Sequence, residues 1–306
     1  MHALPFLVAL PGAAILAPPL LRALTDAGHT RPNYRGRALA CPFGVLTLAA
    51  SALALIPLTL VQRVASIQVF HPELAPVTLY AFGVLALGLL DDTLAPGPPG
   101  APGASGPPSA PGAPSAPDAP DAPDARGAGP RGWRGHAAAT LRGELSTGAL
   151  KAAGSLGLAL LAMSYLGLSN GRWLLAAGVL VLATNVFNLL DLRPGRASKA
   201  FVLLGAGVLI GSADLRALWA LGLFVAPALV AGAYDLRERA MLGDTGSNLL
   251  GALAGLWLVL ALSGTGQLIA LALLAAITIY GEIRSISALI ERTPILRQLD
   301  SLGRPA

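Results

Sequence analysis

An acidic, glycine-rich turn leads directly into an apolar run at Met241-Leu242-Gly243-Asp244-Thr245-Gly246-Ser247-Asn248-Leu249-Leu250-Gly251. A charged side chain at the edge of a membrane is usually functional, so Asp244 indicates a ligand. Glycines let the backbone turn tightly and approach a ligand, and the N–H groups at a helix N-terminus bind anions. The carboxylate and these amides together suggest a site for a metal ion and a diphosphate. A polar helix cap at the membrane edge is the structural alternative.

The composition of the chain is typical of a membrane protein. Of its 306 residues, 54% are hydrophobic and only 12% are charged, and the mean hydropathy is +0.65. Apolar runs long enough to span a bilayer recur along the sequence. We therefore predict an all-α polytopic membrane protein with about nine transmembrane helices. The predicted spans are 3–24, 42–62, 74–90, 149–168, 173–190, 198–213, 216–233, 246–263 and 266–281.

The basic residues predict the orientation of the chain in the membrane. With the N-terminus outside, only Arg63, Arg172 and Arg216 of the 21 lysines and arginines lie on the outer side. This distribution follows the positive-inside rule. We expect a multi-pass protein of the plasma membrane whose catalytic loops face the cytoplasm. The pI near 9.9 reflects these loop arginines, and we expect no nucleic-acid partner.

Composition also divides the chain into four segments. Residues 1–93 form the first part of the membrane domain, 94–132 a Pro/Ala/Gly-rich insertion, 133–281 the second part, and 282–306 an amphipathic basic cytoplasmic tail. The insertion runs in triplets with almost no bulky apolar side chains. Such a segment cannot offset its ordering entropy, so we predict a disordered cytoplasmic insertion. A collagen-like triple helix is the less favoured alternative.

Polar side chains gather at the cytoplasmic ends of the predicted helices. They are Asp91 and Asp92 after the third run, Asn185, Asn188 and Asp191 at the end of the fifth, and Asp244 before the eighth. The spacing in the fifth run places its three polar residues on one helix face. Each cluster alone fits helix capping or helix–helix contact. Their shared side of the membrane favours one joint site.

The chemistry of these side chains suits a hard cation. Mg²⁺, or Mn²⁺ as the alternative, usually binds one or two carboxylates together with substrate phosphates. Two adjacent carboxylates such as Asp91 and Asp92 can divide the work, one as base or nucleophile and the other beside the cation. Arginines in the cytoplasmic loops can clamp phosphates. Alternatively, those arginines only determine the topology.

The motifs resemble those of the polyprenyl-phosphate N-acetylhexosamine-1-phosphate transferases, also called glycosyltransferase family 4. Asp91-Asp92 is similar to the family's DD motif, and Asn185-Val-Phe-Asn188-Leu-Leu-Asp191 to its NxxNxxDG motif. The stretch 243–251 is similar to GDTGSxxLG, the most specific motif of the set. The family includes the phospho-MurNAc-pentapeptide translocase and the GlcNAc-1-phosphate transferases. The resemblance covers nearly the whole chain apart from the insertion.

The resemblance implies Mg²⁺-dependent transfer of a sugar-1-phosphate from a UDP-sugar to undecaprenyl phosphate, in cell-envelope glycan synthesis. It implies that Asp244 and Asn188 hold the metal, and that Asp91 and Asp92, with Asp191, are catalytic. The expected substrate-binding residues are Asn185, Gly243, Thr245, Gly246, Ser247, Arg35, Arg193, Arg196, His136 and Arg297. The membrane and both substrates are the expected partners, and a homodimer is left open.

The chain departs from the family pattern in two places. Leu192 follows Asp191 where the family has glycine, and no histidine follows His136 where the family has a C-terminal histidine cluster. Arg297 is a candidate replacement as a diphosphate contact, or it only meets anionic head groups. These departures keep a second function open. The alternative is a catalytically lapsed relative that binds a polyprenyl-phosphate lipid or scaffolds envelope assembly.

Overall fold

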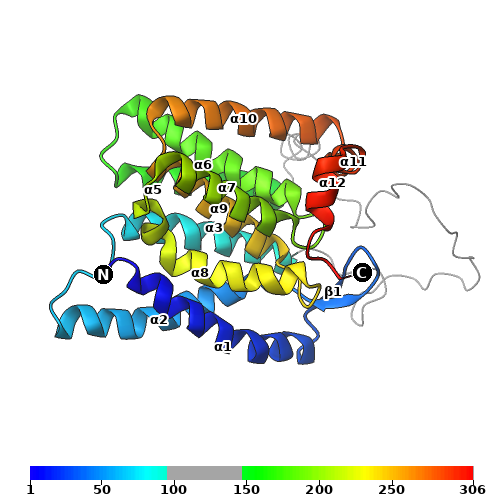
Figure 1. The fold of residues 1–306 in the computed structure, drawn as a ribbon, viewed down its shortest axis with the longest axis horizontal. Coiled ribbons are helices and arrows are strands. Elements are labelled where there is room, and N and C mark those ends of the chain that lie inside the picture. The colour runs from blue at the N-terminus through cyan, green and yellow to red at the C-terminus, as the bar shows by residue number, and fades with distance from the viewer. Residues whose placement is uncertain (95–146, 306) are drawn as a thin grey trace, which may run out of the picture.

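The computed structural model of the chain describes residues 1–94 and 147–305 (Figure 1). The predicted insertion falls outside these residues except at its first position, and so does His136. The described helices are α1 (Leu4–Asp26), α2 (Val45–Val64), α3 (Leu74–Leu94), α5 (Thr147–Ser164), α6 (Asn170–Leu190), α7 (Arg196–Ser212), α8 (Arg216–Leu236), α9 (Gly243–Ala261), α10 (Gly264–Ile283), α11 (Ile286–Arg292) and α12 (Pro294–Ser301). Two short strands, β1 (Thr30–Pro32) and β2 (Ala38–Ala40), form an antiparallel hairpin.

The helical prediction is confirmed for the part of the chain that the structure describes. Each predicted span coincides with a helix from α1 to α10, and seven of these helices are long and apolar enough to cross a membrane. The apolar stretch of α5 is shorter, and α7 has 17 residues. The fold therefore indicates a multi-pass membrane protein, while the number nine stays a prediction. The hairpin is the one addition to the predicted all-α class among the described residues.

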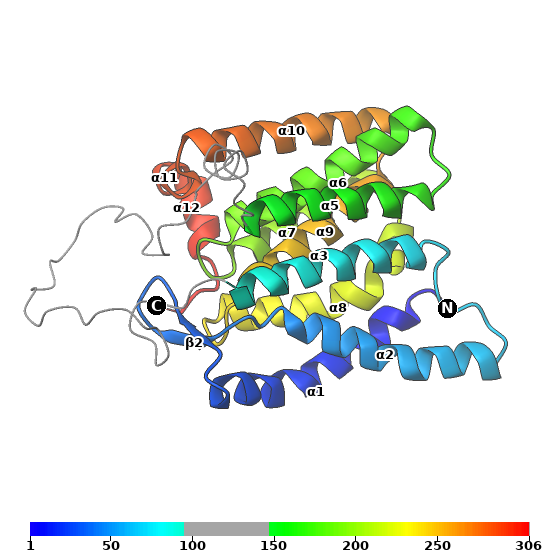
Figure 2. The same ribbon diagram turned by 180° about the vertical axis from the view of Figure 1, so that it is seen from behind.

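Helix α9 lies at the centre of the bundle, between α6 and α7 on one side and α3 and α8 on the other (Figures 1 and 2). In its most apolar stretch 83% of the residues are buried. Gly251 allows α9 to approach α6, because a Cβ atom there would lie 2.5 Å from the Thr184 Cα. The motif that begins α9 is thus fixed by a rigid, closely packed helix.

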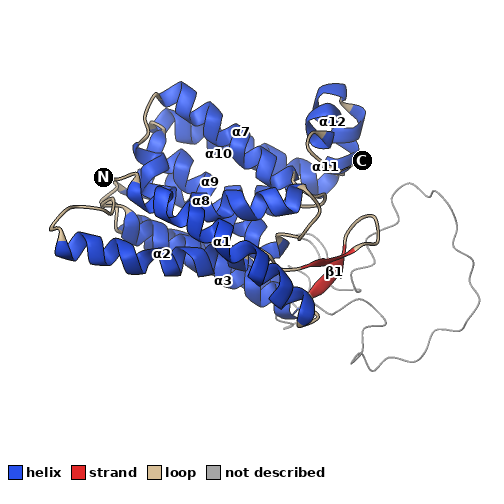
Figure 3. Ribbon diagram, turned by 60° about the horizontal axis from the view of Figure 1, so that its bottom comes forward, coloured by secondary structure: helices blue, strands red, loops and turns tan. Residues whose placement is uncertain are grey.

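The hairpin and the helices α11 and α12 lie at one end of the bundle, and the N-terminus lies at the other (Figure 3). We call these the hairpin end and the N-terminal end. The buried carboxylate of Glu238 fastens the hairpin to the turn between α8 and α9. It accepts hydrogen bonds from Asn33 Nδ2 and Tyr34 Oη, both at 3.2 Å, and pairs with Arg35 at 3.7 Å and Arg37 at 3.6 Å. Glu238 is not among the residues predicted from the sequence.

Candidate active site at the hairpin end

Asp92, near the end of α3, caps the N-terminus of α9. Its buried carboxylate accepts hydrogen bonds from the Asp244 N–H at 3.2 Å and from the Thr245 N–H and Oγ1 at 2.8 and 2.7 Å. Arg31 of β1 lies 3.3 Å from the same carboxylate. The negative charge sits at the positive end of the helix dipole, where it is stabilising. Two of the amides that the sequence analysis assigned to an anion therefore bind Asp92.

The glycine before Asp244 is required by this capping geometry. Gly243 has a φ of +70°, a backbone conformation that side chains with a Cβ rarely adopt. A Cβ atom at this position would also lie 2.7 Å from the Asp92 Oδ2. The glycine therefore brings the start of α9 into contact with α3, and Asp92 and Asp244 become neighbours.

Lys151, in the first turns of α5, joins Asp91 to Asp244. Its Nζ donates to the Asp91 Oδ2 at 2.9 Å and to the Asp244 Oδ2 at 2.7 Å. The three side chains keep 17, 20 and 27% of their exposure, respectively, so this cluster reaches the surface. Lys151 is not among the site residues predicted from the sequence. Its signal was a lone lysine in an otherwise apolar helix, where a charge needs a partner.

The polar side chains on one face of α6 contact two different helices, α9 and α10. The Asn188 Oδ1 accepts a hydrogen bond from the Ser247 Oγ at 3.3 Å, which places Asn188 one turn of α9 beyond Asp244. The Asn185 Nδ2 instead donates to the Thr278 Oγ1 of α10 at 3.3 Å. Asp191 is the half-buried C-cap of α6. Asn188 is therefore the residue of this motif that faces the Asp244 helix.

The predicted residues inside the α9 motif are enclosed by the protein. Thr245, Gly246 and Ser247 are buried. Thr245 donates a hydrogen bond to Asp92, and Ser247 donates one to Asn188. Burial of these side chains holds the motif in shape. Asp244 is the residue of this motif whose side chain reaches the surface beside Asp91.

The carboxylates at the hairpin end suit a cation only where a further ligand completes its coordination. Among the described residues, no group of three or more His, Cys, Asp or Glu side chains is arranged to hold a metal ion. Asp91 and Asp244 already share one cationic group, the Lys151 ammonium. Carboxylate oxygens are the donors that Mg²⁺ accepts when phosphates complete its coordination. The donor set therefore fits Mg²⁺ together with a phosphate ligand.

The predicted arginines lie at the same end and bind other protein groups. Arg35 pairs with Glu238, and Arg193 pairs with Glu291 of α11. The Arg193 guanidinium also lies over the Tyr34 ring, 5.5 Å from its centroid. These contacts tie the loops around the carboxylates together.

The C-terminal tail is docked onto the loop between α6 and α7. Arg196, only 5% exposed, donates to Asp300 of α12 at 2.9 and 3.1 Å. Arg304 donates to the same carboxylate at 3.1 and 2.7 Å. Burial raises the pKa of Asp300, but the hydrogen bonds from Arg196 and Arg304 outweigh it and lower the pKa to about 2. Arg297, on the same helix, is exposed.

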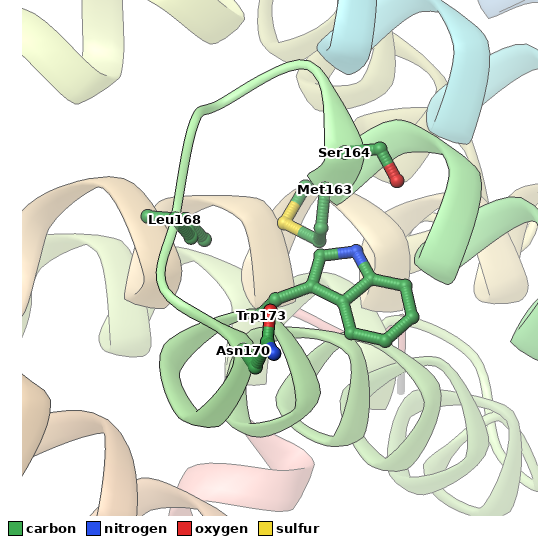
Figure 4. A pocket seen from close by; sticks show the side chains of 5 residues that line it. All are labelled: Met163, Ser164, Leu168, Asn170 and Trp173. Atoms are coloured by element: carbon green, nitrogen blue, oxygen red, sulfur yellow. The ribbon is translucent and has the colours of Figure 1, made fainter.

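A small pocket of about 250 Å³ lies at the N-terminal end, far from these carboxylates (Figure 4). It is formed where the loop between α5 and α6 passes over the Trp173 ring, with Met163 beside it. The Trp173 Nε1 donates to the Leu160 carbonyl at 2.9 Å, so the indole is fixed by the protein. The pocket contains none of the predicted site residues.

The chain matches no protein-family model, and no curated protein matches it.

Proposed function

We propose that the chain transfers a sugar-1-phosphate from a UDP-sugar to undecaprenyl phosphate. The sugar-1-phosphate that we favour is N-acetylhexosamine-1-phosphate. The observation that carries this proposal is the cluster of Asp91, Lys151 and Asp244, which brings together three helices at one end of the bundle. Carboxylates beside a cation are what phosphoryl transfer needs, because it relies on positioning and on charge neutralisation. In the proposed orientation this end faces the cytoplasm, where nucleotide-sugars are made.

The residues of the cluster suggest a division of roles. Asp244 and Asn188 would hold Mg²⁺, which when bound neutralises charge on the diphosphate. Lys151 offsets part of the charge of the two carboxylates, so a divalent cation bound there would compete with it and free its ammonium group for a phosphate oxygen. Asp91 would accept any remaining proton from the attacking lipid phosphate. Asp92, engaged by α9, would position Asp244 rather than touch the substrate.

The proposed reaction is a substitution at the β-phosphorus of the UDP-sugar. An oxygen of the lipid phosphate forms a bond to that phosphorus, and the bond from the phosphorus to the bridging oxygen breaks. The electron pair leaves with UMP, and the product is a lipid-linked diphosphate sugar. Arg31, beside Asp92 and partly exposed, is a second cation near the carboxylates that can meet the phosphates.

A catalytically lapsed lipid-binding or scaffolding protein is the second candidate function. The observation that favours it is the ion-pair network of the tail, in which Arg196 binds Asp300 instead of standing free for a substrate. No histidine follows His136 in the sequence that could contact a substrate in place of Arg196.

Turnover by the purified protein separates the two candidates. The protein is reconstituted with undecaprenyl phosphate and a panel of UDP-sugars, and the lipid-linked product is measured with Mg²⁺, with Mn²⁺ and with EDTA. The enzyme proposal predicts product from at least one UDP-sugar that disappears with EDTA. Absence of product from every donor, with bound lipid retained, would support the lapsed relative.

A further inference from the structure

An apolar cavity of about 380 Å³ lies between α7, α8 and the docked tail. Phe201 and Leu203 of α7, Leu229 of α8, and Leu299 and Leu302 of the tail contribute to its lining. Ligand sites typically measure about 300–1,000 Å³ and combine an apolar lining with a few polar groups. This cavity fits that description, and none of Asp91, Lys151 and Asp244 lines it.

Lys199 is the charged side chain that lines the cavity, and the charges of Arg196, Arg304, Asp300 and Asp235 act on it from nearby. The Lys199 Nζ donates to two neutral main-chain carbonyls of the tail, those of Asp300 and Leu302. Arg196 and Arg304 share one carboxylate, that of Asp300. Asp235 of α8 is the second carboxylate here, and it accepts a hydrogen bond from the Gly195 N–H at 2.7 Å. The three cations therefore face two carboxylates, a balance that favours an anionic ligand.

The surface around the cavity is suited to contact with a bilayer. Val202 and Leu203, which line the cavity, are 50 and 56% exposed. Exposed apolar side chains on a helix of a multi-pass protein face lipid tails rather than water. Lys199 lies in the first turn of α7, where a lysine reaches the head-group layer.

From these observations we infer that the cavity binds one acyl chain of an anionic phospholipid, with the lipid phosphate against Lys199. The apolar lining contacts the acyl chain, and the excess positive charge attracts the anionic head group. Because Leu299 and Leu302 form one wall, the bound lipid also packs against the tail. This inference is independent of the sugar-phosphate transfer proposed above.

Native mass spectrometry of the full-length protein tests this inference. The protein is mixed with phosphatidylglycerol or phosphatidylcholine carrying identical acyl chains, and the retained lipid is counted. We expect about fivefold stronger retention of phosphatidylglycerol, because one lysine near its net negative charge contributes about that much, whereas the choline group cancels this charge in phosphatidylcholine. Lys199→Gln should remove this preference, whereas Arg22→Gln, on the exposed surface of α1 at the same end, should keep it.

A second variant tests the cavity itself. Ala233 lines the cavity, so Ala233→Trp should fill it and lower the retention of both lipids at least fivefold. Ala206→Trp adds the same ring on the exposed face of α7 and should change nothing. If Ala233→Trp does not fold, the lipid preference of Lys199→Gln, compared with that of the natural chain, still tests the inference. Equal retention of the two lipids by the natural chain, or unchanged retention in folded Ala233→Trp, would overturn the inference.

Discussion

At the scale of single residues, neighbouring carboxylates have different surroundings. Asp92 is buried and receives three hydrogen bonds from the start of α9, whereas Asp244 is partly exposed and shares Lys151 with Asp91. The sequence motifs identified both residues but could not separate their roles. The difference depends on contacts between residues far apart in the chain, which no local pattern contains.

Asp92 should contribute mainly to stability. Asp92→Ala removes the cap of α9 and leaves Arg31 without its carboxylate, so we expect a loss of about 1–2 kcal/mol in the free energy of unfolding. Thermal unfolding in detergent measures this loss. Thr93→Ala, at the exposed neighbouring position, is the matched control. An unchanged melting temperature in Asp92→Ala would show that the cap contributes little.

Asp244 should contribute mainly to activity. Asp244→Asn keeps the shape of the side chain and the packing of α9, so the protein should fold as before. We expect turnover to fall by about 100-fold or more, because the substitution weakens a ligand of the proposed cation and also the ion pair with Lys151. The control is Asp214→Asn, a carboxylate at the N-terminal end that pairs with Arg216. Full activity in Asp244→Asn would show that this residue only caps the start of α9.

At the scale of elements, the sequence predicted the helices well and their partners poorly. Long apolar runs set each helix, so every predicted span coincides with one. The hairpin was not predicted, because its strands are three residues long and Glu238, a distant residue, fastens it. The tail was expected to be amphipathic and basic, but its docking depends on Asp300, whose partner Arg196 lies 104 residues away.

The docked tail should respond to acid. The docked Asp300 has a pKa lowered to about 2, against about 3.9 for a free aspartate. Its ion pairs therefore stabilise docking fully above about pH 4, and this stabilisation is lost as the pH falls towards 2. A fluorophore attached through Ser301→Cys should report release in that range. Asp300→Asn should release the tail already at neutral pH, and a tail that stays docked in this variant would refute the assignment.

At the scale of the whole molecule, composition alone predicted a multi-pass helical bundle. It did so because a bilayer requires long apolar helices with internally satisfied backbones. The arrangement around the central α9 and the meeting of α3, α5 and α9 at Lys151 arise from packing, so they appear only in the folded chain. The gathering of the polar motifs at one end was predicted, and the structure brings Asp91, Asp92, Asn188 and Asp244 to that end.

The fate of the β-phosphate tests the proposed chemistry most directly. A UDP-sugar labelled with ³²P at the β-phosphate is incubated with the reconstituted protein, undecaprenyl phosphate and Mg²⁺. Transfer of a sugar-1-phosphate predicts that the label moves into the lipid fraction while an equal amount of UMP is released. Label that remains with the nucleotide, as UDP or as unreacted donor, would contradict the account.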